Sequence, residues 1–239
     1  MELNTSTIVS DIVRSNFKTA QLFEKNNINF CCGGGISIAE ACKTANIDVN
    51  GLLSEIEQVL LDSDPDARFV EGLELDELAD YIVKRHHSYV KENIPFLRMK
   101  LQKLCDAHAD DNPELLEVQQ LFEETARNLT THMQKEEMVL FPFIRNLVKQ
   151  KQGRSTATQP GAIRGPINVM EHEHQAEGDR LEKIRILTDN YTVPATGCNT
   201  YRVTFKTLED FELDFHRHIH LENNILFKKA IALEQELSN

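Results

Sequence analysis

Two histidine–glutamate pairs with the same spacing carry the clearest chemical signal in the sequence. His132 precedes Glu136 by four residues, and His218 precedes Glu222 by four. On an α-helix such residues lie on one face, about 6 Å apart along the axis, so both side chains can reach one metal ion. Both pairs interrupt stripes of apolar residues that recur at helical spacing. The stripes include Val118, Phe122, Leu129, Val139 and Phe143 around the first pair, and Phe205, Leu208, Phe211, Phe215 and Ile225 around the second.

Single histidines mark two further helical stripes. His174 interrupts a third stripe. Its apolar members are Ile163, Ile167, Met170, Leu181 and Ile184. In the first helical segment the periodicity allows two stripes, one through His86 and one through His87, and it leaves open which of them faces the interior.

Buried glutamates at these positions require a compensating charge. An unpartnered carboxylate in a core costs several kcal/mol. A pair of metal ions between the helices supplies the compensation, with Glu136 and Glu222 bridging the metals and the histidines in outer positions. The competing interpretation is a hydrogen-bonded polar network without metal. Spacing does not choose among iron, manganese and zinc, and four histidines with two glutamates leave coordination positions open for a small ligand.

The remaining histidines are predicted to lie off the stripes, in turns or on solvent-facing helix surfaces. They are His108, His172, His216 and His220. Glu137 and Glu173 adjoin predicted ligands in the sequence. We expect both to be solvated, the alternative being that they hydrogen-bond the ligands.

Five cysteines include the adjacent pair Cys31 and Cys32. An odd number with a strained adjacent pair does not indicate a disulfide framework. The pair precedes three glycines and a predicted helix start at Ser37, and helix N-termini favour thiolates. We therefore hypothesise that Cys31 and Cys32 run redox chemistry or hold iron or nitrosyl iron, against the alternative of two small hydrophobes in a tight turn. A structural role is expected for Cys42, Cys105 and Cys198.

Composition points to an all-α protein. The 239 residues are 41% hydrophobic and contain no Trp, and long stretches rich in Leu, Glu, Lys and Ala dominate. The net charge of −12 argues against nucleic acid as a partner. The apolar runs are too short to span a membrane, and the N-terminus lacks a secretory signal, so we expect a cytoplasmic protein.

Turn residues divide the chain into two domains. A small helical N-terminal domain is predicted at residues 1–61, a linker at 62–72 where Pro and Asp disfavour helix, and an up-down four-helix bundle at 73–239. A break is expected at Pro142. The four predicted bundle helices cover residues 76–105, 114–150, 166–189 and 199–237.

These motifs resemble a known family over nearly the whole chain. The segments around His132–Glu137, Met170–His174 and His218–Asn224 resemble the hemerythrin-like domain of the bacterial repair-of-iron-centres proteins. The segment Phe30–Gly34 resembles that family's N-terminal domain. The resemblance selects His86 over His87, which is then expected to face solvent. The ligand set that the resemblance implies is His86, His132, Glu136, His174, His218 and Glu222.

The resemblance also implies a function. It implies two non-haem iron ions per chain and repair of iron–sulfur clusters after oxidative or nitrosative stress, so that the partners are proteins with damaged clusters. Since some family members dimerise, a homodimer is expected. Two alternatives are a nitric oxide-reducing enzyme and a module that binds or senses O2 or NO. Cys31 and Cys32 favour repair, because a gas carrier has no need of thiols.

Overall fold

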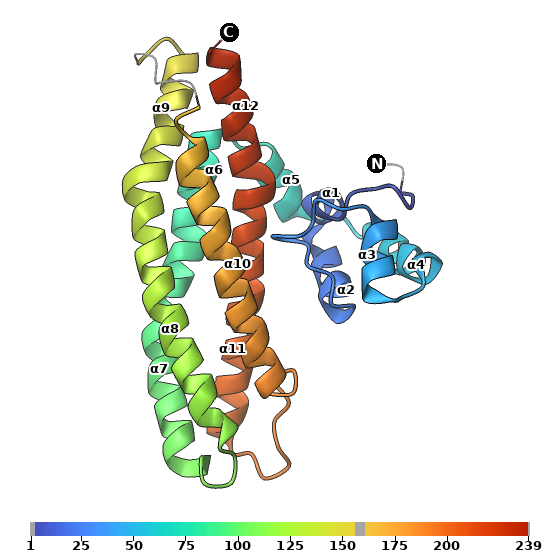
Figure 1. The fold of residues 1–239 in the computed structure, drawn as a ribbon, viewed down its shortest axis with the longest axis vertical. Helices are drawn as coiled ribbons and strands as arrows, with labels where there is room; N and C mark the ends of the chain where they lie inside the picture. The colour runs from blue at the N-terminus through green and yellow to red at the C-terminus, as the bar shows by residue number, and fades with distance from the viewer. Residues whose placement is uncertain (1–2, 156–160, 239) are drawn as a thin grey trace. The chain divides into compact units, whose positions relative to one another are not determined.

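The computed structural model describes residues 3–155 and 161–238 (Figure 1). Most of these residues are helical, and their one strand-like pairing is an isolated bridge between Ile8 and Ser37. The all-α prediction is confirmed. None of the helices in this part of the chain is long and apolar enough to cross a membrane.

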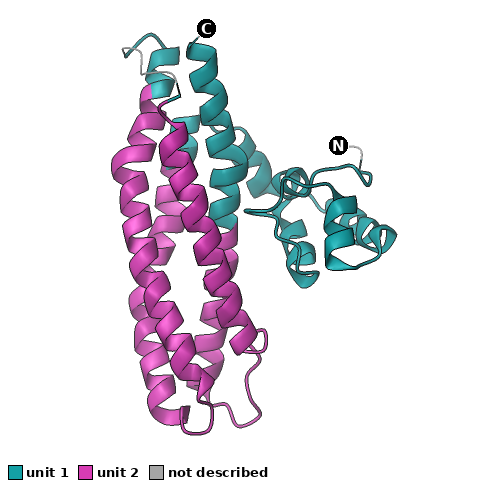
Figure 2. Ribbon diagram, viewed as in Figure 1, with its two compact units in different colours: residues 1–79, 147–161, 217–239 teal, residues 80–146, 162–216 magenta. Residues whose placement is uncertain are grey.

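The chain divides into two compact units (Figure 2). Unit 1 comprises residues 1–79, 147–161 and 217–239, and unit 2 comprises residues 80–146 and 162–216. Three of the four boundaries fall inside continuous helices, because the ends of these long helices group with the N-terminal segment.

The long helices follow the predicted ranges closely. Three of them contain a single π-helical turn, where the backbone bonds reach one residue further than in an α-helix. The first long helix is α6 (Leu75–Ile82), π turn η2 (Val83–His87) and α7 (Ser88–His108). The second is α8 (Glu114–Lys135), π turn η3 (Glu136–Leu140) and α9 (Phe141–Lys151). The third is α10 (Arg164–Leu187), and the fourth is α11 (Asn199–Leu221), π turn η4 (Glu222–Leu226) and α12 (Phe227–Leu237).

Unit 2 contains a helical bundle in which α8 packs against both α7 and α10. Its interior is filled by the apolar stripes that the sequence predicts. Phe122 of α8 meets Phe211 of α11 edge to face at 5.5 Å between ring centroids, and Tyr201 meets Phe205 at 4.6 Å. Such pairs add to the burial of the large rings.

The π turn η3 shifts the buried face of the second helix. The sequence predicts that the buried apolar stripe continues through Val139 and Phe143. In the structure Val139 is 57% exposed, and the buried residues are Leu140, Phe141 and Ile144. One extra residue in the turn rotates the following helix relative to the 3.6-residue pattern. The break expected at Pro142 is thus present as a π turn that ends just before it.

Unit 1 contains the short helices of the N-terminal segment. They are α1 (Val9–Ser15), the 3-10 turn η1 (Phe17–Thr19), α2 (Ala20–Lys25), α3 (Ile38–Ala45), α4 (Val49–Leu60) and α5 (Pro65–Glu71). Ser37 and Glu40 form the predicted capping box at the start of α3. The start of α4 is capped by Asp48, whose side chain accepts the Gly51 N–H.

The stretch predicted as a non-helical linker contains helix α5. Asp64 caps this helix, since its Oδ1 accepts the backbone N–H groups of Asp66 and Ala67 at 3.0 and 3.2 Å. Pro65 occupies the first turn, where a missing N–H costs nothing. Asp64 and Pro65 therefore start a helix, and the expectation that they would disfavour one was wrong.

Replacing Asp64 with Ala is expected to destabilise unit 1 by about 1–3 kcal/mol, because it removes a helix cap and also the acceptor for the Phe17 N–H, 2.9 Å from Oδ2. Urea unfolding measures the loss. The control is Asp62→Ala, since the Asp62 side chain is 83% exposed. Equal midpoints for the two variants would contradict this role of Asp64.

Candidate metal centre

All three π turns of the described residues carry side chains that the sequence singled out for chemistry. His87 ends η2, Glu136 begins η3 and Glu222 begins η4. π turns are rare and concentrate at functional sites, because the extra residue redirects a side chain without ending the helix. Their coincidence with histidine and glutamate marks these turns as the parts of the long helices that are shaped for a site.

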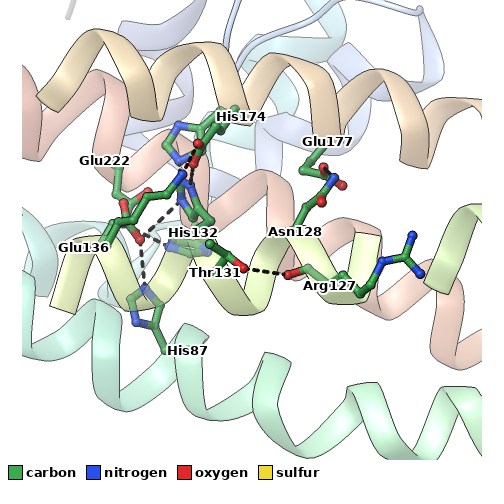
Figure 3. Close-up of polar contacts among 12 residues, drawn as sticks. His87, Arg127, Asn128, Thr131, His132, Glu136, His174, Glu177 and Glu222 are labelled. Carbon is green, nitrogen blue, oxygen red and sulfur yellow. Dashed lines mark hydrogen bonds and ion pairs between the residues drawn. The ribbon is translucent and has the colours of Figure 1, made fainter. Parts of the chain in front are cut away.

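In unit 2, side chains from three helices converge on Glu136 (Figure 3). Its Oε2 lies 3.3 Å from the Nε2 atoms of both His87 and His132. The Nε2 atoms of His132 and His174 are 3.0 Å apart. All four side chains are buried. The arrangement brings one carboxylate and three imidazoles together inside the bundle.

The distance between His132 and His174 is that expected for two ligands of one metal. Two nitrogens that bind one ion at right angles, each about 2.1 Å from it, lie roughly 3 Å apart. The ligand atoms of His132, Glu136 and His174 all lie within 4.8 Å of one another. The residues present therefore fit a bound cation, which also offsets the charge of the fully buried Glu136.

The second predicted pair lies in unit 1. His218 Nε2 is 3.0 Å from Glu222 Oε1, one helical turn away, and both side chains are buried. The predicted geometry of the His-x3-Glu pair is therefore present in this pair as well as in His132 and Glu136.

Glu137 and Glu173, which the sequence analysis expected to be solvated, hydrogen-bond the histidines. Glu137 Oε1 lies 2.8 Å from His87 Nδ1 and 2.8 Å from Lys91 Nζ. Glu173 Oε2 lies 2.9 Å from His132 Nδ1, and its other oxygen bonds Lys135. A carboxylate that accepts the Nδ1–H leaves Nε2 unprotonated for a metal.

The charge of these outer carboxylates is stabilised from both sides. Burial opposes ionisation, but hydrogen bonds from Lys91 and His87 outweigh it and lower the pKa of Glu137. Lys135 and His132 lower the pKa of Glu173 in the same way. Both groups are therefore carboxylates at neutral pH. In the sequence, Lys91 follows His87 by four residues and Lys135 follows His132 by three. This spacing is the one local sign of the hydrogen bonds of these histidines to Glu137 and Glu173.

The structure brings His87, and not His86, to the cluster. His86 is buried too, but its Nδ1 lies 2.9 Å from Asp214 and its ring packs edge-on against Tyr81. The π turn η2 explains the difference, because it ends with His87 and shifts the helix phase at this point. The stripe before the turn and the stripe after it belong to different faces of an ideal helix, so 3.6-residue periodicity could not choose between the two residues.

The histidines expected on the surface divide into two groups. His172 is exposed, as predicted, and His108 and His216 are partly exposed. His220 was expected to face solvent but is 1% exposed. Its Nδ1 lies 3.2 Å from the amide nitrogen of Asn224.

The double-cysteine segment is fixed within unit 1. Asn29 Oδ1 accepts the N–H groups of Cys32 and Gly33 at 3.0 and 3.1 Å. A Cβ on Gly34 would lie 2.1 Å from the Phe30 carbonyl oxygen, so the segment requires glycine there. Asn224 Nδ2 donates to the Cys31 carbonyl at 3.0 Å.

The thiols of this segment do not lie at a helix N-terminus. Cys31 is buried, its Sγ lies 4.0 Å from that of Cys32, and α3 begins only at Ile38. The hydrogen bond with Cys32 and then burial raise the pKa of Cys31 well above its usual value. The expectation of a helix-activated thiolate therefore does not hold for Cys31.

The thiol whose pKa is lowered is that of Cys198, for which a structural role was expected from the sequence. Its Sγ is exposed and lies 3.4 Å from His108 Nε2. The hydrogen bond with His108, followed by bonds from the N–H groups of Tyr201 and Thr200 at the start of α11, lowers the pKa of Cys198 to about 7. His108 and Cys198 are 90 residues apart in the chain, so no local pattern announces the pair.

Comparisons with known proteins match both the N-terminal segment and the long helices. The Hemerythrin HHE cation binding domain matches residues 78–230, and a domain of unknown function, DUF542, matches residues 5–60. An iron–sulfur cluster repair protein YtfE of Musicola paradisiaca is 36% identical over 220 residues, 91% of this chain and 92% of the relative. An iron–sulfur cluster repair protein ScdA of Staphylococcus haemolyticus is 32% identical over 227 residues, 95% of this chain and 99% of the relative.

The helical bundle with its buried histidines and glutamates defines a hemerythrin-like cation-binding protein. More closely, the chain belongs to the family of iron–sulfur cluster repair proteins, with which it aligns over nearly its whole length. The resemblance inferred from the His/Glu pattern and the double cysteine is confirmed.

Removing the carboxylate of Glu173 is expected to weaken metal binding by about 10–100-fold, the usual effect of losing a partner of a ligating histidine. Competition of Glu173→Ala with a chelator measures the change. Glu171→Ala is the matched control, since Glu171 is exposed two residues away on the same helix. Equal affinities of the two variants would show that Glu173 does not orient His132.

Cys198 is expected to be the fastest of the thiols to react with iodoacetamide at neutral pH, with half of the maximal rate near pH 7, because its pKa is lowered to about 7. In His108→Ala the pKa rises and the rate at pH 7 falls about fivefold. Peptide mapping of the alkylated sites reports each thiol separately. Cys105, whose pKa burial raises, serves as the slow reference. A rate at Cys198 that does not depend on His108 would refute the pairing.

Proposed function

We propose that this protein repairs iron–sulfur clusters that oxidative or nitrosative stress has damaged in other proteins, through a centre of two non-haem iron ions. The observation that carries the proposal is the buried cluster of His87, His132, Glu136 and His174 in a chain of the cluster-repair family. The family's names describe this action for its relatives, and the cluster gives the present chain the means to hold iron.

The ligand set that we propose replaces His86 by His87. In unit 2 the ligands are His87, His132, Glu136 and His174. The pair of His218 and Glu222 in unit 1 completes the set, because both units contribute residues to the one matching hemerythrin domain at 78–230. Glu136 and Glu222 would supply carboxylate oxygens to the iron ions, since each is fully buried and has two oxygens to offer.

The residues around the ligands prepare the site for exchangeable iron. Bound iron would supply redox chemistry and a source of metal for a damaged cluster. Glu137 and Glu173 hold the Nδ1 protons of His87 and His132, which keeps the Nε2 atoms ready to bind a cation. Six ligands for two metals leave positions open, and NO or O2 are the small ligands that we infer for them.

The cellular setting follows from the thiols. No disulfide joins the cysteines in the described residues, which suits a reducing compartment such as the cytoplasm.

We propose a homodimer, on the precedent of the resemblance. The pair of Cys31 and Cys32 is proposed to handle iron or nitrosyl iron, with the half-exposed Cys32 as the reactive member.

The adjacent histidines give a sharp test. His87→Ala is expected to lose most of the iron of the anaerobically purified protein, whereas His86→Ala keeps about the wild-type amount, because His86 bonds Asp214 instead. Metal analysis of both folded variants decides between them. Loss of iron in His86→Ala alone would overturn the proposed ligand set.

Repair is tested with the same variants. A [4Fe–4S] protein treated with nitric oxide should regain its cluster absorption and activity with the wild type and with His86→Ala, and not with His87→Ala. An iron-loaded protein that restores no cluster would refute repair. Steady consumption of NO without restoration would indicate the nitric oxide-reducing alternative.

A further inference from the structure

A cavity in unit 1 lies beside the double-cysteine segment. Its volume of about 20 Å³ is enough for one small molecule or ion, since roughly 10–15 Å³ suffices for a water molecule. Val13, Phe17, Val70, Leu221 and Ile225 give it apolar walls. The polar side chains in its lining are Arg14, Arg217 and His220.

His220, which lines this cavity, has one ring nitrogen without a hydrogen-bond partner among the described residues. The Asn224 side-chain amide can only donate through its nitrogen, so His220 Nδ1, 3.2 Å away, accepts a hydrogen bond and carries no proton. The proton of the neutral ring is therefore on Nε2. This atom is buried and has no hydrogen-bond partner among the described residues.

The two arginines keep the cavity positive. Arg14 pairs with Asp11 at 3.5 Å and Arg217 pairs with Asp66 at 3.3 Å. The carboxylates are 43% and 67% exposed, so these pairs are weak and neutralise the arginines only in part. Neither carboxylate lines the cavity. Arg217 is held in place over the ring of Phe17, with its guanidinium carbon 4.9 Å from the centroid.

The polar lining contains donors and no acceptor side chain. Both guanidinium groups only donate, and the His220 nitrogen that could accept is already occupied by Asn224. A water molecule there would find no side-chain acceptor for its own two protons. An anion needs donors only, and its charge is favoured by the nearby cations.

We propose that this cavity binds one small monovalent inorganic anion, held by the Nε2–H of His220 and the guanidinium groups of Arg14 and Arg217. Chloride and nitrite share the required chemistry. The site lies outside the metal centre, and it contacts the double-cysteine segment through Asn224, which bonds both His220 and the Cys31 carbonyl.

The test is chloride binding to the full-length, iron-loaded protein at constant ionic strength, followed by the line width of the ³⁵Cl NMR signal. We expect a saturable excess width that bromide or nitrite displaces. Nitrite is the preferred occupant if it halves the excess width at a concentration below that of chloride, and chloride is preferred otherwise.

Three variants locate the bound anion. Ala67→Leu fills the cavity and should abolish binding, and Arg14→Gln should weaken it roughly tenfold through loss of a charge-assisted hydrogen bond. Arg68→Gln removes the same charge from an exposed position outside the lining and should leave binding unchanged.

Two results would overturn the proposal. One is the absence of excess width in the wild type, or equal binding by all three variants. The other is binding that survives Ala67→Leu and disappears in His87→Ala, since the anion would then lie at the metal centre.

Discussion

The burial of one carboxylate, Glu136, is the constraint around which the centre of unit 2 is built. A fully buried negative charge is tolerated only next to positive charge or strong donors. Outward from this group lie the histidines, then the carboxylates of Glu137 and Glu173, and finally Lys91 and Lys135 at the surface, and a bound cation would offset the charge of Glu136 itself. Each layer stabilises the one inside it, so the orientation of the innermost imidazoles is set by ion pairs that reach solvent.

Helix geometry had to be altered to place this carboxylate. In a regular helix the metal-facing residues and the core residues must follow the same 3.6-residue repeat. A residue turned toward the centre would therefore rotate the residues after it away from their packing positions. The π turn η3 absorbs the difference: Glu136 points into the cluster, and Leu140, Phe141 and Ile144 return to the core in a new phase. The π turn lacks regular α-helical hydrogen bonds, and the free energy gained by burying these large apolar side chains offsets that loss.

The same turns set the limit of what the sequence could predict. Periodicity alone placed His132, Glu136 and His174 on the buried face, because both histidines lie in regular α-helix and Glu136 is the first residue of its π turn. His86 and His87 lie within a π turn, where the period changes, and the resemblance chose the residue that bonds Asp214. Hydrogen bonds between residues distant in the chain, such as His108 with Cys198 and Glu173 with His132, could not be predicted from helical spacing. Fold class and helix ranges were therefore predictable, while phase changes and long-range hydrogen bonds were not.

Within unit 1, the π turn η4 connects the metal-binding chemistry to the thiols. Glu222 begins the turn, and the next two residues reach the double-cysteine segment: Asn223 Nδ2 lies 3.8 Å from Cys32 Sγ, and Asn224 bonds the Cys31 carbonyl. All three side chains project from a single turn of backbone, so the position of Glu222 and the positions of both asparagines depend on the same short segment. Since Cys31 is buried and its pKa is raised, its thiol has little reactivity of its own. The turn thus places a proposed metal ligand and two contacts to the cysteine segment on three consecutive residues.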